Sequence, residues 1–177
     1  LSDIYVEGIR HITLTDIEHA HALGYKIKLL ALGSRSSNNT ISLRVHPTLI
    51  PKEHLLANIN NEFNAAYISG NAVGEVLLSG KGAGGSPTGS AIVSDIIDIA
   101  FDISQKVNRR NLETELNEVV VSSIDTLNSQ YYIRLTAADE PHILEKITHT
   151  LSDAEINISK ITQETTEECA EIVIITH

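Results

Sequence analysis

The residues best suited to chemistry lie in a glycine-rich stretch, GKGAGGSPTGS, at positions 80–90. Because glycine has no side chain, such a turn between a strand and a helix can bring backbone N–H groups close to an anion or a flat cofactor. The stretch is not a P-loop, and it does not fit the G-x-G-x-x-G fingerprint of a βαβ unit. The pattern leaves two interpretations open: a close approach to a ligand, or a tight, close-packed turn.

The other reactive residue types predict no site. His19 and His21 stand two residues apart in an expected helix, so they point to different faces, and none of the eight histidines has a carboxylate or cysteine at a metal-binding spacing. Ser86 lacks the nucleophile-elbow context of a serine hydrolase. The single cysteine, Cys169, allows no internal disulfide, which fits a reducing cytoplasm. We therefore expect no metal site.

The elements before the glycines follow from hydrophobic periodicity and turn residues. Residues 15–24 predict a short helix with a capping box from Thr15 to Glu18 and a stop at Gly24. Alternating apolar runs then predict two hairpins, with a loop and a short helix between them. The first hairpin pairs 25–32 with 40–47, the loop and helix lie within 47–59, and the second hairpin pairs 63–70 with 72–80 around Gly70 and Asn71.

A long amphipathic helix should follow the glycines. Ser86 is the expected N-cap, Pro87 suits the first helical position, and the helix should end near Lys106. Aspartates form its polar stripe. Its apolar face is predicted from Ile92, Val93, Ile96, Ile97, Ile99, Phe101 and Ile103.

The chain then restarts as a second module. A charged and polar linker is expected over 108–129, between a first domain at 1–107 and a small α+β domain at 130–177. The second domain reads strand, helix, strand, strand. Its helix, within 141–153, should turn Ile143, Leu144, Ile147 and Leu151 inward.

Composition narrows the function classes. The net charge of −10 over 177 residues argues against nucleic acid or an anionic membrane as a partner, and no apolar run approaches the ~20 residues of a membrane span. No secretory signal is visible, so we expect a cytoplasmic protein. The sequence contains no methionine and opens on Leu1, as a piece of a longer protein would.

Several stretches resemble bacterial homoserine dehydrogenase over nearly the whole chain. They are YVEGIRHIT, LGYKIKLLAL, the run from RVHPTLIP through GKGAGGSPTGSAIVSDIIDIA, and LTAADEPHILEKIT with INISKITQ. The resemblance implies an α+β fold: a mixed and antiparallel sheet with helices on one side, the end of the substrate-binding and dimerisation domain. It also implies that a partial ferredoxin-like βαββ module of the ACT type follows.

The resemblance implies a dehydrogenase that interconverts L-homoserine and L-aspartate 4-semialdehyde with NAD or NADP, and that forms a homodimer or higher oligomer. In the family, the Rossmann domain and the G-x-D-x-x-x-K element with the catalytic lysine precede this segment. The resemblance therefore assigns no catalytic residue here, and we expect the chain alone to be inactive. Lys28 matches a structural strand, where it could pair with Glu7. The alternative is a regulatory or dimerising fragment that senses an amino acid.

Two sets of site residues follow from the resemblance. Near the nicotinamide, the cofactor should meet Gly82, Gly84, Gly85 and Thr88. A weak amino-acid effector site should involve Asp139, Pro141, His142, Ile143 and Asn157. His142 stands where many ACT domains have a glycine, so its side chain should crowd the effector.

Overall fold

The computed structural model describes residues 3–35, 39–106, 119–138, 140–165 and 169–177. It divides into two compact units, one formed by Leu1–Leu49 with Val120–His177 and the other by Ile50–Val119. The first unit thus joins the N-terminal strands to the segment expected as a second module. Most of the expected linker, residues 108–118, lies outside the described residues. No helix in the described part of the chain is long and apolar enough to span a bilayer.

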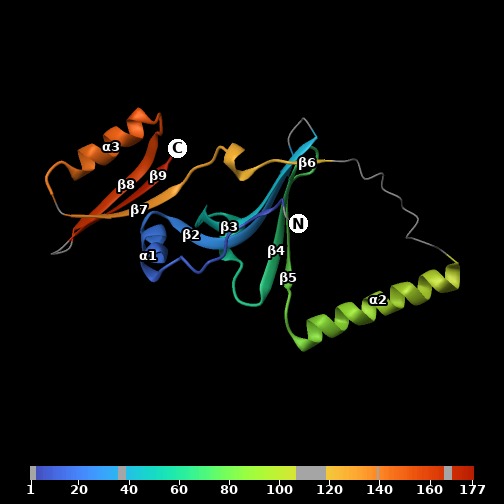
Figure 1. Ribbon diagram of the computed structural model, residues 1–177. Coiled ribbons are helices and arrows are strands. Elements are labelled where there is room, and N and C mark those ends of the chain that lie inside the picture. The colour runs from blue at the N-terminus through green and yellow to red at the C-terminus, as the bar shows by residue number, and fades with distance from the viewer. Residues whose placement is uncertain (1–2, 36–38, 107–118, 139, 166–168) are drawn as a thin grey trace. The chain divides into compact units, whose positions relative to one another are not determined.

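A four-stranded sheet organises the N-terminal part of the first unit (Figure 1). The long strands β2 (Tyr25–Arg35) and β3 (Thr40–Pro51) are hydrogen-bonded neighbours, as their alternating sequences predict. The short strands β1 (Tyr5–Val6) and β6 (Val120–Val121) both pair with β3 in parallel, so the sheet is mixed. A 3₁₀ turn, η3 (Ile124–Thr126), follows β6.

Helix α1 (Leu14–Ala22) has its N-cap two residues earlier than the sequence analysis expected. Its N-cap is Thr13 and its capping box pairs Thr13 with Asp16, so the prediction of Thr15 and Glu18 was wrong. Gly24 follows the helix with φ +88°, which agrees with the expected stop. The inward face consists of Asp16, His19 and Ala20, all buried, whereas His21 points to solvent.

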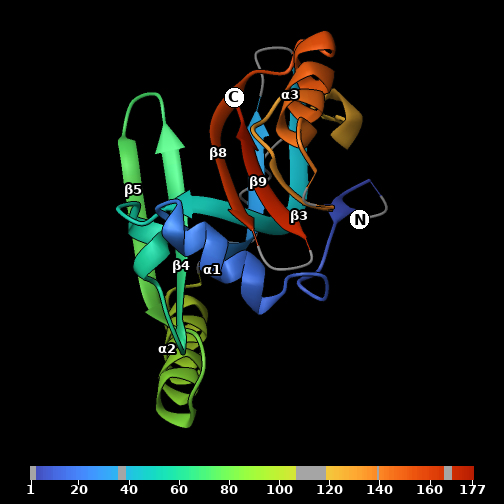
Figure 2. The ribbon, with the colours of Figure 1, turned by 90° about the vertical axis from the view of Figure 1, so that its left-hand side faces the viewer.

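The expected strand–helix–strand–strand module is present in the first unit. It consists of β7 (Tyr132–Ala137), α3 (Ile143–Asp153), β8 (Ile158–Thr165) and β9 (Ala170–Thr176). The strands form an antiparallel sheet in the order β7-β9-β8, so β9, the last of them in the sequence, lies in the middle. Figure 2 shows α3 lying along one face of this sheet. Strand β7 is therefore an edge of the described sheet.

The core of the module is β9, which is covered on both faces. Residues Ile172, Val173, Ile174 and Ile175 are at most 4% exposed. Successive side chains of a strand point to opposite faces, so Ile172 and Ile174 face α3 and the other two face the opposite way. On the helix side, Ile147 and Leu151 line a pocket with Ile174. Leu144, expected inward, is 37% exposed.

The second unit holds a hairpin that leads into a helix. Strands β4 (Phe63–Gly70) and β5 (Gly74–Lys81) pair antiparallel around a three-residue turn, after the 3₁₀ turn η1 (Leu55–Asn58). Figure 1 shows β5 leading directly into α2 (Gly85–Gln105). The N-cap of α2 is Gly84, with φ +119°, so the expectation of a Ser86 cap was wrong. The helix ends at Gln105 with Lys106 as its C-cap, close to the predicted end.

The apolar face of α2 has no cover in the described structure. No residue of this helix is buried. The periodicity predicted the helix correctly, yet each residue of its apolar stripe is more than half exposed: Ile92, Val93, Ile96, Ile97, Ile99, Phe101 and Ile103. A contiguous exposed patch of this kind needs cover from another segment or another chain.

We predict that Ile172→Ala destabilises the first unit by about 3 kcal/mol, because it removes a completely buried branched side chain and leaves a cavity. Ile161→Ala on neighbouring β8 is the matched control. Its side chain is 37% exposed, so its loss should cost about 1 kcal/mol or less. Chemical denaturation of the two variants measures the difference, and equal losses would contradict a core centred on β9.

Candidate functional site

The glycine loop joins β5 to α2 and is anchored to the start of the hairpin. The N–H of Gly82 donates to the carbonyl of Glu62 at 3.0 Å. The Lys81 ammonium lies 3.1 Å from the Glu62 carboxylate and over the ring of Phe63. These contacts fix the end of β5, and therefore the point where the chain turns into α2.

The three glycines that were expected to meet a cofactor are there for different reasons. A side chain at Gly82 would clash with Asn64 of β4. Gly84 has φ +119°, a conformation that other residues adopt only with strain, and an added Cβ would lie 3.3 Å from Pro87. Gly85 has an ordinary φ, and nothing in the described structure lies within 4 Å of the position of its Cβ. Only Gly82 and Gly84 are therefore explained by local packing or backbone geometry.

The first turn of α2 is accessible to a ligand. Thr88 is exposed, and its N–H donates to the Gly84 carbonyl at 3.1 Å. No acidic residue occupies this turn, so the partial positive charge of the helix N-terminus is not opposed by a side chain of its own. The structure thus brings Gly82, Gly84, Gly85 and Thr88 together on one short segment.

The expected effector residues lie at both ends of α3. Pro141, His142 and Ile143 form its N-terminus, and Asp139 lies outside the described residues. His142 is the N-cap, with φ +72°, and its Nδ1 lies 3.0 Å from the Glu145 carboxylate on the protein surface. The backbone therefore keeps the left-handed conformation that favours glycine, although a histidine occupies it.

Asn157 is separated from these residues within one chain. It follows the C-terminus of α3, and its carbonyl accepts the N–H of His177 at 2.8 Å. Eleven helical residues span about 16 Å. A compact site that uses both His142 and Asn157 would therefore need a second copy of the module.

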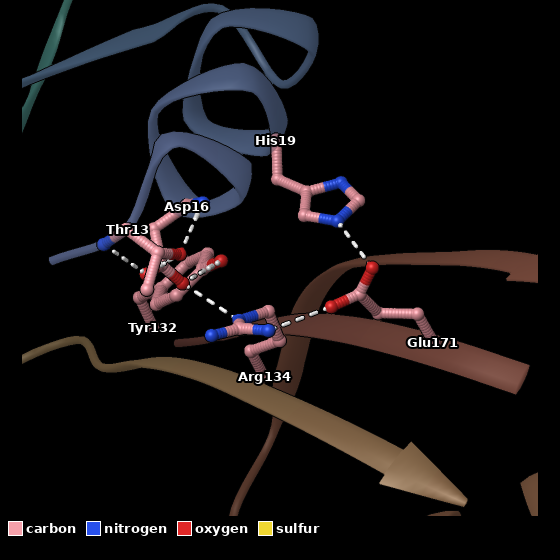
Figure 3. A network of polar contacts seen from close by, with 6 residues as sticks. All are labelled: Thr13, Asp16, His19, Tyr132, Arg134 and Glu171. Atoms are coloured by element: carbon pink, nitrogen blue, oxygen red, sulfur yellow. Dashed lines mark hydrogen bonds and ion pairs between the residues drawn. The ribbon is translucent and has the colours of Figure 1, made fainter.

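A polar network on the first unit was not predicted from the sequence (Figure 3). The Asp16 carboxylate accepts hydrogen bonds from the backbone N–H of Thr13 at 2.8 Å and from its hydroxyl at 2.6 Å. It also accepts from the Tyr132 hydroxyl at 3.1 Å and from Arg134 Nε at 2.7 Å. Asp16 is 5% exposed. A buried carboxylate needs such partners, because desolvation penalises its charge.

The network continues across the sheet to β9. Arg134 Nη1 donates to Glu171 at 2.8 Å, and the other oxygen of Glu171 lies 3.2 Å from Nε2 of the buried His19. One guanidinium therefore joins the carboxylates of Asp16 and Glu171, and helix α1 contacts the sheet through both Asp16 and His19. Lys160 of β8 adds a further link, since its ammonium donates to the carbonyl of Leu23 at 2.9 Å.

The pKa values reflect these contacts. Burial raises the pKa of Asp16, but the hydrogen bonds from Thr13, Arg134 and Tyr132 outweigh burial and bring it below its usual value. Hydrogen bonds from Arg134 and His19 lower the pKa of Glu171. Burial and the charge of Asp16 raise the pKa of Tyr132. Both carboxylates are therefore charged, and the phenol protonated, at neutral pH.

The network is a structural contact, and it forms no metal site. No cluster of three or more metal-ligating side chains exists among the residues that the structure describes. The sequence offered one signal that could have identified Asp16, namely that TLTD at 13–16 fits a capping box as well as TDIE at 15–18 does. Nothing local points to Arg134, which stands 118 residues away.

We predict that Asp16→Asn lowers the free energy of unfolding by about 2 kcal/mol at pH 7, because it removes the charge that Arg134 faces. Folding lowers the pKa of Asp16, so its carboxylate stabilises the fold above the unfolded value near ~4 and loses this effect as pH falls through the folded value. The gap between wild type and variant should therefore close below about pH 4. Asp153→Asn, in an exposed pair with His149, is the control and should change stability by less than about 0.5 kcal/mol.

Two family models match the chain. One, described as homoserine dehydrogenase, matches residues 1–97, and one described as ACT domain matches residues 131–177. The glycine loop lies within the first match, and the sheet of β7, β8 and β9 with α3 lies within the second. The α+β class that the sequence predicted, with its ACT-type module, is thereby confirmed.

Individual relatives agree. A homoserine dehydrogenase from Neisseria gonorrhoeae is 40% identical and one from Pseudomonas aeruginosa is 38% identical, over 99% and 98% of this chain. A crystal structure of a homoserine dehydrogenase from Thiobacillus denitrificans matches 99% of the chain with a TM-score of 0.86 and 37% identity. The chain spans only 42% of the first two relatives and 41% of the third. By these matches, and by the fold that they share, the chain belongs to the homoserine dehydrogenase family.

Proposed function

We propose that this chain is part of an enzyme that interconverts L-homoserine and L-aspartate 4-semialdehyde with NAD or NADP, a step in the biosynthesis of threonine and methionine. Family membership supports the reaction. The structural observation that supports a role for this segment is the empty space beside Gly85, where an added Cβ would meet no atom within 4 Å. Packing and φ explain Gly82 and Gly84, so of the three glycines expected at the cofactor Gly85 is the one left for a ligand.

The role of the segment would be to form one wall of the cofactor site. Gly82 and Gly84 shape the turn, Gly85 leaves the approach to α2 open, and Thr88 offers a hydroxyl on the exposed first turn. A nicotinamide ring could lie against such a side-chain-free surface. Hydride transfer also needs the pyrophosphate held and an acid–base group near the substrate oxygen. We assign these to parts of the full-length relatives that this chain does not span, so the 177 residues alone should not turn over substrate.

We further propose that the enzyme is a homo-oligomer. The apolar stripe of α2 is compatible with this, because a helix whose seven stripe residues are all more than half exposed needs cover in the working protein, from a second copy or from the part of the relatives that this chain does not span. The competing interpretation, a purely regulatory fragment, gives the glycine loop no use. The loop therefore favours a catalytic over a purely regulatory role.

Gly85→Ala tests the cofactor wall. In a full-length enzyme that carries this segment, we expect the KM for the nicotinamide cofactor to rise about tenfold, because a methyl group would occupy the approach to the loop. Stability should not fall, since alanine at a helical position without steric conflict stabilises by about 0.5–1 kcal/mol.

Gly89→Ala is the matched control, one turn further along α2, where an added Cβ also meets nothing within 4 Å. It should leave the KM unchanged. Equal cofactor KM values for wild type and Gly85→Ala would assign the loop to packing alone.

We propose that the ACT-type module binds L-threonine weakly or not at all. His142 occupies the left-handed N-cap position of α3, where its imidazole, directed to Glu145, would crowd an amino acid. Calorimetric titration should give a Kd above about 1 mM, worth less than about 4 kcal/mol. His142→Gly should tighten binding if crowding is the cause. A wild-type Kd below that limit would contradict the proposal.

A further inference from the structure

The first unit contains a second candidate site, formed by residues other than those of the glycine loop. A cavity of about 610 Å³ is lined by residues from β1, the segment before α1, the N-terminus of α1, β2, β3 and the segment that leads into β7. This volume is in the range of small-molecule sites. It opens on the face of the β7-β9-β8 sheet opposite to α3, where Ile175 and Arg134 contribute to the wall.

Aromatic side chains gather in this cavity. The chain has five tyrosines, and four of them line it: Tyr5, Tyr25, Tyr131 and Tyr132. The face of a phenol ring attracts a cation. The structure shows this at Tyr25, where the ammonium of Lys160 lies 4.7 Å from the ring centroid. Branched aliphatic residues complete the wall, among them Ile12, Ile27 and Leu127.

The charge in the cavity is negative. Its charged lining residues are Glu7, Asp16 and Arg134, together with the histidines His11 and His46. Arg134 is shared between Asp16 and Glu171, so its charge is already matched by two carboxylates. Arg44 donates to His46 and does not line the cavity. Glu7 is therefore the lining carboxylate that Arg134 does not neutralise.

Glu7 is placed to receive a ligand. One of its oxygens, Oε2, accepts a hydrogen bond from the hydroxyl of Tyr5 at 3.0 Å. Among the described contacts, this is the hydrogen bond that the Glu7 side chain makes to another residue of the cavity wall. That bond raises the pKa of Tyr5, which keeps the phenol protonated as a donor. Glu7 is exposed, so a ligand can reach it from solvent.

We propose that this cavity binds a small organic cation, a primary ammonium on a branched apolar body. The ammonium lies between Glu7 and the tyrosine rings, and the apolar body contacts the aliphatic wall. An α-amino acid carries the same ammonium, but its carboxylate would meet the excess negative charge, with Arg134 already engaged. The proposal concerns a part of the chain distinct from the glycine loop, and its test does not depend on turnover.

Tyrosine fluorescence gives a local readout, because the chain has no tryptophan and four of its five tyrosines line the cavity. The probe is 3-methylbutan-1-amine, titrated into the 177-residue chain at about pH 8, above the ordinary range of histidine titration. The neutral isostere 3-methylbutan-1-ol and the zwitterion L-leucine are titrated in parallel. We expect saturable binding of the amine, at least about tenfold weaker binding of the alcohol, and weaker binding of leucine than of the amine.

Glu7→Gln should weaken binding of the amine about tenfold and leave the alcohol unchanged. Glu18→Gln removes the same charge from the exposed face of α1, outside the cavity lining, and should change the amine Kd less than about twofold. Circular dichroism checks that both variants fold. Equal affinity for amine and alcohol, tighter binding of leucine, no saturation by the amine up to about 10 mM, or an unaltered Kd in Glu7→Gln would each overturn the proposal.

Discussion

The arrangement of the first unit depends on a single cation shared by two carboxylates. Arg134 of β7 donates to Asp16 of α1 and to Glu171 of β9, and both carboxylates are largely buried. This guanidinium supplies the positive charge that both acids face, and an unpaired buried charge would cost several kcal/mol. The guanidinium in turn fixes where α1 lies against the sheet. The wall of the cavity, which includes Asp16, Tyr132 and Arg134, follows from the same contact.

The choice of helix cap shows how a distant contact decides a local ambiguity. Thr13 with Asp16 and Thr15 with Glu18 both fit a capping box, and local sequence favours neither. The cap forms at Thr13 and Asp16 because the Asp16 carboxylate also accepts hydrogen bonds from Tyr132 and Arg134. Glu18, on the exposed face, cannot reach these partners. Sequence analysis could place the helix, the hairpins and the βαββ module, since these follow from periodicity and turn residues. It could not place a contact between residues 118 positions apart.

The cap of α2 in the glycine loop likewise differs from the one that local sequence favours. Periodicity placed the strand and the helix on either side of it, but serine seemed a better cap than glycine. The backbone of Gly84 has φ +119°, so the cap is set by the sharp turn and uses no side-chain hydrogen bond. The sequence could show that glycines gather here. The folded structure separates Gly82, where a side chain would meet Asn64, from Gly85, which faces open space.

Helix α2 has a thermodynamic consequence for the second unit. Its 21 residues contain a run of isoleucine and valine, which are poor helix formers in isolation, and none of them is buried. A helix of this length gains most of its stability from packing, so its ordering and its burial must be one coupled event. The entropic cost of ordering this helix then reduces the net free energy of binding to whatever surface covers it. The helical far-ultraviolet circular dichroism of the second unit thus becomes a measure of assembly, and its magnitude increases as the apolar stripe is covered.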